Sequence, residues 1–284
     1  MSQPSIVIPV DLTNPGQFFA CCGLLELADR LWPGAEGWFD GNRFSLCRCG
    51  TLDDIHGAFR EMTIDNTMCE SDRARVKELA AIKEARKLSP EEEADKKRLE
   101  SLRRELPIVL HGPVRLHIDW FTDNLAGGSR FKTWAGQQSV LDIAQNMHRS
   151  IDSGADLWGS LRKSGLPFNF DSDLGSQGSA LDIGFSFDPL AGSELTRIEG
   201  ACKPALELLS FVGLQRFRPR EVQGQNRFVY VAWTTPLVPS VAATVACEAV
   251  PLANCKRYAF SLLYRTKYLK SFLPATRTEG DRDE

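Results

Sequence analysis

The order of strand-like and helix-like segments in the first 122 residues is the feature that constrains the fold most. Strand-like segments carry β-branched or alternating apolar residues, and helix-like segments repeat apolar residues at spacings of three and four. In chain order these segments are residues 5–10, 17–32, 37–40, 43–48, 51–62, 108–110 and 114–121. The order β-α-β-β-α-β predicts an α+β fold in which residues 1–122 form a ferredoxin-like or RRM-like domain. The aromatic signatures of a true RRM are absent from the sequence, so this expectation depends on topology alone.

Asn14 or Thr13 is the predicted N-cap of the helix that includes residues 17–32, with Pro15 at the first helical position, and Gly23 lies inside this helix. Glycine in a helix interior costs about 1 kcal/mol relative to alanine. We therefore expect Gly23 to allow close packing against another part of the backbone.

Residues 70–106 carry charges of both signs and interrupt this pattern. Ser89 and Pro90 divide the insertion, because serine caps helices and proline favours the first helical position. The few apolar residues on either side form two narrow helical stripes. The sequence therefore predicts an antiparallel helical hairpin that projects from the body. A solvated structural hairpin is the favoured interpretation, and a docking arm for another subunit is the alternative.

Residues 123–278 form a second predicted α+β half, which contains a glycine-rich basic loop and further basic strips. Its predicted helices are residues 140–151 and 201–213, and its predicted strands are residues 181–187, 227–234 and 257–264. The polar tail at 279–284 is expected to be disordered.

Composition excludes several classes of protein. Of the 284 residues 43% are hydrophobic, enough for a core, but no apolar run approaches transmembrane length and no signal-peptide pattern opens the sequence. We therefore expect a cytoplasmic protein without a membrane partner. The eight cysteines are scattered, which argues against a disulfide framework. For the close pair Cys47 and Cys49, buried or half-buried thiols are favoured over a zinc site.

The sequence lacks the residue patterns that most catalytic sites require. None of the four histidines occurs in an HxxxH or HxH context, and no GxSxG, Walker or GxGxxG motif is present. Asp171 and Asp173 stand two apart on a predicted loop, where aspartate more often serves a turn than a cation. We therefore expect no enzymatic activity, no catalytic residue, no metal and no cofactor.

Positive charge is segregated along the chain, although the net charge is only −3. Residues 215–227 contain four arginines and one acid, and residues 254–277 contain six cations and no acid. Segregated basic strips on a neutral body are typical of a nucleic-acid groove. The residues expected to contact phosphates are Arg216, Arg218, Arg220, Lys256, Arg257, Lys267 and Lys270.

Residues 125–139 mix glycines with basic, aromatic and amide side chains. In an extended segment Arg130, Lys132 and Trp134 would point the same way, while Phe131 would face the protein. Alternating cations and an indole suit a sugar-phosphate backbone with a stacked base.

Two glutamines, Gln137 and Gln138, end this loop and offer the paired donors and acceptors that read base edges. The alternative for the whole loop is a solvated connection whose Trp134 packs under the following helix. The loop is therefore a candidate nucleic-acid contact with a purely structural alternative.

Two segments resemble one known protein family. Residues 8–32 (IPVDLTNPGQFFACCGLLELADRLW) followed by GWF, and residues 127–139 (GGSRFKTWAGQQS), look like the small form of the large subunit of type I-U CRISPR effector complexes. These complexes, also called type I-G, are of the Cascade kind. At 284 residues the chain is small for a large subunit, which leaves open whether it performs every task of one.

The resemblance implies a non-catalytic subunit of an RNA-guided surveillance complex in antiviral defence. Such a subunit lies near the 5′ end of the guide RNA, checks the flanking motif (PAM) in duplex DNA and helps to present the target to a separate helicase-nuclease. Base pairing then reads the rest of the target. The implied partners are guide RNA, target double-stranded DNA, the backbone and guide-end-binding subunits, and the helicase-nuclease.

Other functions remain open at this point. The ferredoxin-like order would equally allow a backbone subunit that coats the guide RNA. A protein-protein adaptor would place the function in the helical hairpin and leave the basic strips solvated. A nuclease is the least favoured alternative, because the sequence lacks clustered acids or histidines.

Overall fold

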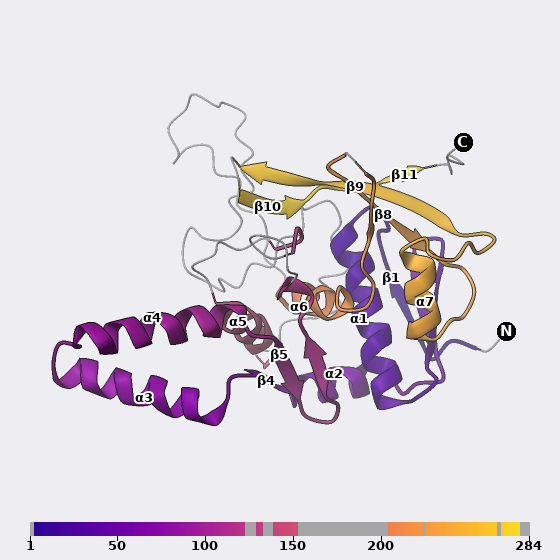
Figure 1. Ribbon diagram of the computed structural model, residues 1–284. Coiled ribbons are helices and arrows are strands. Elements are labelled where there is room, and N and C mark those ends of the chain that lie inside the picture. The colour runs from indigo at the N-terminus through magenta and orange to yellow at the C-terminus, as the bar shows by residue number, and fades with distance from the viewer. Residues whose placement is uncertain are drawn as a thin grey trace, which may run out of the picture.

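A computed structural model gives the fold of the protein. It describes residues 3–122, 129–132, 139–152, 204–223, 225–265 and 268–278. The described chain is a mixed α+β structure of helices and antiparallel sheets, as the sequence predicts at this level. Figure 1 shows a body built around α1 and a pair of helices that extends away from it. Within the described ranges, no helix has both the length and the apolar character needed to cross a membrane.

The first sheet has the strand order β1-β3-β2, with both pairs antiparallel. Its strands are β1 (Ile6–Pro9), β2 (Glu36–Asp40) and β3 (Arg43–Cys47). Helix α1 (Pro15–Leu31) connects β1 to β2. It begins where the sequence predicts, because the side chain of Asn14 accepts a hydrogen bond from the backbone N–H of Gln17.

The second sheet differs from the expected topology. Its strands are β4 (Thr63–Asn66), β5 (Ile108–His111) and β6 (Leu116–Ile118), in the order β4-β5-β6. The sequence analysis missed β4, which follows helix α2 (Leu52–Arg60), and expected residues 108–121 to complete a ferredoxin-like sheet. That arrangement is not confirmed, because β5 pairs with β4. The physical reason lies in the insertion, whose two helices return the chain to the edge of the strand it has just left.

Helices α3 (Glu70–Ala85) and α4 (Pro90–Glu105) form the predicted hairpin, which projects from the body in Figure 1. Leu79 and Leu99 are buried, consistent with a narrow apolar seam. Ser89 caps α4 as predicted, through a reciprocal capping box with Glu92. Ion pairs join Arg75 to Asp95 and Arg98 to Asp72 across the hairpin.

The third sheet has the order β10-β9-β8-β7, and β11 also pairs with β9. Its strands are β7 (Arg220–Glu221), β8 (Arg227–Ala232), β9 (Lys256–Arg265), β10 (Tyr268–Phe272) and β11 (Thr276–Thr278). The helices of this half are α5 (Val140–Asp152), α6 (Pro204–Gly213) and α7 (Pro239–Ala246). The sequence predicted α5, α6, β8 and β9 close to these bounds but missed α7. The strand expected at 181–187 lies outside the described residues.

Helices α1 and α6 approach each other closely at two glycines. A Cβ atom on Gly23 of α1 would overlap the carbonyl oxygen of Leu209, and one on Gly213 would overlap the carbonyl oxygen of Phe19. The close backbone approach predicted for Gly23 is therefore confirmed, and α6 is its partner.

Segments from both sides of residue 122 share one hydrophobic core. Phe18 of α1 stacks on Tyr230 of β8, with ring centroids 4.2 Å apart. Trp233, just after β8, donates from Nε1 to the carbonyl oxygen of Gly37 on β2 at 2.6 Å. The halves predicted at 1–122 and 123–278 are thus packed on each other through α1, α6 and β8.

Candidate nucleic-acid interface

One face of the third sheet carries arginines from the predicted basic strips. Side chains alternate between the faces of a strand, and directly opposed residues on neighbouring strands share a face. The register of β7, β8 and β9 therefore places Arg220, Arg227 and Arg257 on one face, which we call the arginine face. The opposite face carries Phe228 and Tyr230 and packs on α1.

Glu248 holds two of these arginines together. Arg220 donates from Nε and Nη2 to Oε2 of Glu248 at 2.8 and 2.6 Å, and Arg257 donates from Nε to Oε1. Glu248 follows α7 with a φ of 60°, in the left-handed region that disfavours residues with a Cβ. The ion pairs therefore hold a backbone conformation that glutamate would otherwise avoid.

The arginine face has more positive than negative charge. Two of its three arginines bind the carboxylate of Glu248, and Arg227 makes no ion pair with any residue that the structure describes. Arg257 also donates to Oγ1 of Thr278 at 3.3 Å. The side chains of Arg220 and Arg257 are 39% and 21% exposed, so the group lies at the surface. Guanidinium groups held in this way can bind phosphate through charge-assisted hydrogen bonds.

The described part of the predicted basic loop packs against the same sheet. The ring of Phe131 contacts those of Phe228 and Phe272, with centroids 4.9 and 5.8 Å apart, so its predicted inward orientation is confirmed. Residues 129–132 form a turn, in which the N–H of Lys132 donates to the carbonyl oxygen of Ser129. The extended conformation expected for this stretch is therefore wrong for residues 129–132. The cause is the anchoring of Phe131 on the sheet, which bends the chain.

Arg130 is held against the protein in this turn. It forms an ion pair with Glu221, and its guanidinium carbon lies 5.2 Å from the centroid of the Phe228 ring. Its side chain is 36% exposed, so part of the guanidinium still faces solvent. Lys132 is half-buried. Arg130 and Lys132 stay candidate contacts, with Arg130 already oriented by a carboxylate and an aromatic ring.

Arg216 lies apart from the arginine face, beside α1. It donates to both carboxylate oxygens of Glu26 at 2.6 and 3.1 Å, and this hydrogen-bonded pair raises the pKa of Arg216. Arg218 is exposed and Lys256 is half-buried. The predicted phosphate contacts are therefore distributed over at least two places.

Several predicted contacts cannot be placed. Trp134, Gln137, Gln138 and Lys267 lie outside the described residues, and so does the side chain of Lys270 on β10. Their assignments stay predictions from the sequence.

Sequence reasoning missed the two carboxylates that organise these arginines, Glu26 and Glu248. Each lies far along the chain from an arginine that it binds, so counting charges within local windows does not find it. For Glu26 a signal was available, because it is an acid in a helix whose residues are otherwise mostly apolar. A charge in such a position is rarely buried unless it is paired.

Two further observations concern metal ligands and reactive thiols. Within the described ranges, no group of three or more histidine, cysteine, aspartate or glutamate residues could hold a metal ion. Burial raises the pKa of the Cys21 and Cys22 thiols, which disfavours the reactive thiolate form. Comparison with known proteins finds neither a matching family model nor a matching curated sequence.

Proposed function

We propose that this protein is a non-catalytic, nucleic-acid-binding subunit of a type I-U (I-G) CRISPR effector complex. In that role it would bind target DNA next to the 5′ end of the guide RNA, recognise the flanking motif and help to recruit the helicase-nuclease. The observation that carries nucleic-acid binding is the arginine face, where two guanidinium groups bind one carboxylate and Arg227 lies on the same face of the sheet. The assignment to this complex depends on the resemblance of residues 8–32 and 127–139.

These two resembling segments pack on the same face of the third sheet. Phe19 of α1 contacts the ring of Phe260, and Phe131 contacts Phe228, which in turn packs on Phe260. A substitution in either segment therefore acts on one aromatic cluster. This supports treating the two segments as parts of one structural unit on the face of the sheet opposite the arginine face.

A backbone subunit that coats guide RNA is the first alternative. The order β1-β3-β2 is compatible with three strands of a ferredoxin-like sheet. For this alternative we propose the complete ferredoxin-like arrangement. A protein adaptor is the second alternative, favoured by the projection of α3 and α4 from the body (Figure 1). Filament-like RNA binding without target DNA would support the first, and assembly without any nucleic-acid contact would support the second.

The test begins with co-purification of the chain with the products of neighbouring genes. A guide RNA recovered in the complex is the expected result, and its reproducible absence would contradict the proposal. The assembled complex is then titrated with duplexes that share one target and differ only in the flanking bases. Each phosphate contact should contribute about 0.7 to 0.9 to the salt slope of binding.

Variants of the arginine face locate the contact. Arg227→Glu should weaken all duplexes alike and lower the salt slope, because phosphate contacts carry no base information. Arg86→Glu at the tip of the hairpin is the matched control, since it makes the same charge change on an exposed arginine away from the sheet. Equal losses for the two variants would show nonspecific charge dependence and contradict the arginine face as the binding surface.

A further inference from the structure

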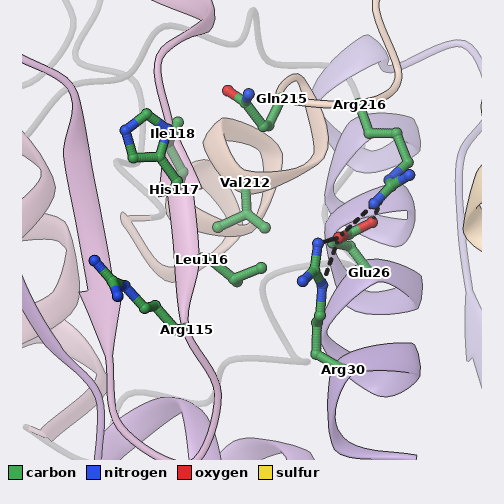
Figure 2. A pocket seen from close by; sticks show the side chains of 9 residues that line it. All are labelled: Glu26, Arg30, Arg115, Leu116, His117, Ile118, Val212, Gln215 and Arg216. Atoms are coloured by element: carbon green, nitrogen blue, oxygen red, sulfur yellow. Dashed lines mark hydrogen bonds and ion pairs between the residues drawn. The ribbon is translucent and has the colours of Figure 1, made fainter. Parts of the chain in front are cut away.

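A cleft lies between α1, β6 and the segment that follows α6, apart from the arginine face (Figure 2). Its volume is about 480 Å³, within the range of small-molecule sites. The strands and helices that form its walls belong to the shared core, so the cleft is built on rigid elements.

One wall carries a carboxylate with two arginines. Glu26 is 6% exposed and accepts from Arg216 at 2.6 Å and from Arg30 at 2.9 Å. Figure 2 shows both guanidinium groups converging on this carboxylate at one side of the cleft. Their side chains are 36% and 44% exposed, so donors not used by Glu26 face solvent. The charge of Glu26 is thus paired with two arginines, and the remaining N–H donors of these arginines can bind a second anion.

The opposite wall is the edge of β6, where apolar and polar side chains alternate. Leu116 and Ile118 are buried, and with Val212 of α6 they form an apolar floor. Arg115 and His117 alternate with them, so their exposed side chains lie on the other face of β6, away from Glu26 and Arg30 (Figure 2).

Gln215 closes one end of the cleft and is held in a single orientation. Its Oε1 accepts from the backbone N–H groups of Asp119 and Trp120 at 2.9 and 3.1 Å, and its Nε2 donates to Asp119 Oδ1 at 2.8 Å. The amide therefore fixes the chain just after β6 and keeps that end of the cleft in place.

An apolar floor with two arginines on one wall suits a ligand that has a flat ring and an anionic group. Guanidinium groups bind phosphate through paired N–H donors and also stack on planar rings. We propose that this cleft binds one nucleotide, with its base over the apolar floor and its phosphate near Arg30 and Arg216. This proposal rests on the proposed function if the nucleotide is part of a bound strand. A free mononucleotide offers the same base and phosphate to the cleft.

The test uses the full chain and two probes. Adenosine monophosphate tests the free nucleotide, and an eight-residue single-stranded oligonucleotide with one 2-aminopurine reports insertion of a base through its fluorescence. Saturable binding of either probe is expected. Competition by the oligonucleotide would assign the cleft to a strand, and binding of the monophosphate alone would assign it to a free nucleotide. No saturable binding of either probe would overturn the proposal.

Two variants localise the binding. Arg30→Gln should lower affinity for the probe at least tenfold with little change in the melting temperature, because Arg30 is 44% exposed and has donors that Glu26 does not use. Arg115→Gln is the matched control, since it removes an exposed cation from the other face of β6, and it should leave the affinity unchanged. Unchanged affinity in Arg30→Gln, or an equal loss in the two variants, would overturn the proposal.

A third variant separates this proposal from the proposed function. Arg227→Gln on the arginine face should weaken duplex binding by the assembled complex and leave mononucleotide binding by the chain unchanged. Loss of mononucleotide binding in this variant would contradict the cleft as the site. Intact mononucleotide binding by a chain that assembles with no guide RNA would instead reject the proposed function and keep the cleft.

Discussion

Two carboxylates of this protein each hold two arginines, but their surroundings differ. Glu26 is 6% exposed and lies on a helix in the core, whereas Glu248 is 19% exposed and lies beside the third sheet. A charge taken out of water must keep its partners, because leaving it unpaired costs several kcal/mol. An ion pair nearer the surface contributes about 0 to 1 kcal/mol, so another anion can compete for its arginines at little cost.

The comparison concerns the carboxylates more than the arginines. Arg216 joins Glu26 of α1 to the segment after α6, whereas Arg30 lies on α1 itself, four residues after Glu26. The arginine side chains are 36% and 44% exposed beside Glu26 and 39% and 21% exposed beside Glu248. The burial of the carboxylate is therefore what should set the cost of its loss.

The largest effect is expected where α1 and α6 meet, one helical turn before Glu26. Gly23→Ala should lower the free energy of unfolding by about 3 kcal/mol, because the new methyl group would overlap the Leu209 carbonyl oxygen. It should disturb the Glu26 group while leaving the Glu248 group in place. Urea denaturation measures the loss.

Gly57→Ala on α2 is the matched control for this variant. A Cβ at Gly57 meets no atom within 4 Å, so alanine should raise the stability by about 0.5 to 1 kcal/mol through helix propensity. Equal changes in the free energy of unfolding for the two variants would show that α1 and α6 do not cross closely. Changes of opposite sign would confirm the close crossing.

Glu26→Gln should lower the free energy of unfolding by about 2 kcal/mol. This value lies between those for buried and exposed pairs, because Glu26 is buried and its arginines are partly exposed. Chemical denaturation of the chain measures it. A loss of stability below about 0.5 kcal/mol would mean that the ion pairs of Glu26 contribute no more than those expected for Glu248.

Glu248→Gln should cost less than about 1 kcal/mol of stability and should strengthen duplex binding by the assembled complex. Removing the one carboxylate of the arginine face leaves Arg220 and Arg257 without a bound anion, so phosphate has no competitor. The salt slope of binding should become steeper. Weaker binding would mean that Glu248 orients the arginines more than it competes for them.

The sequence was sufficient for features set by local chemistry. The helix entry at Asn14, the capping box at Ser89, the hairpin and the close approach of Gly23 all follow from residue types at fixed spacings. The inward orientation of Phe131 was also predicted, although a turn takes the place of the extended segment from which it was predicted. These features depend on nearest neighbours in the chain, which the sequence states directly.

Features that depend on distant pairing were not predictable in the same way. The strand β4 is four residues long, and its partner β5 follows only after two inserted helices, so local periodicity gives no sign of the pair. Glu26 and Arg216 are 190 positions apart, and no local pattern joins them. The predicted basic strips therefore identified arginines without identifying which carboxylates hold them.

An ion pair within the tip of the hairpin, where Arg86 is 55% and Glu92 is 16% exposed, extends the comparison and gives the smallest expected effect. Glu92 at the tip of the hairpin accepts from Arg86 and from the backbone of Ser89, and these contacts lower its pKa from the usual carboxyl value to about 2. An ordinary carboxyl in the unfolded chain has a pKa of about 4.3. Because the folded value is the lower one, the stabilisation is complete above the unfolded pKa and is lost as pH falls towards 2.

Amide hydrogen exchange of residues 87–95 measures this effect, since the tip can open without unfolding of the body. The exchange rates of Glu92→Gln and of the unmodified chain are compared at the same pH. The amide hydrogens of Glu92→Gln should exchange faster at pH 6, and the difference in exchange rate should shrink between pH 4 and pH 2.5. Glu91→Gln is the control, because Glu91 makes no hydrogen bond or ion pair with a described residue in the same turn. A difference that stays constant over this range would mean that the charge of Glu92 adds nothing to the stability of the tip.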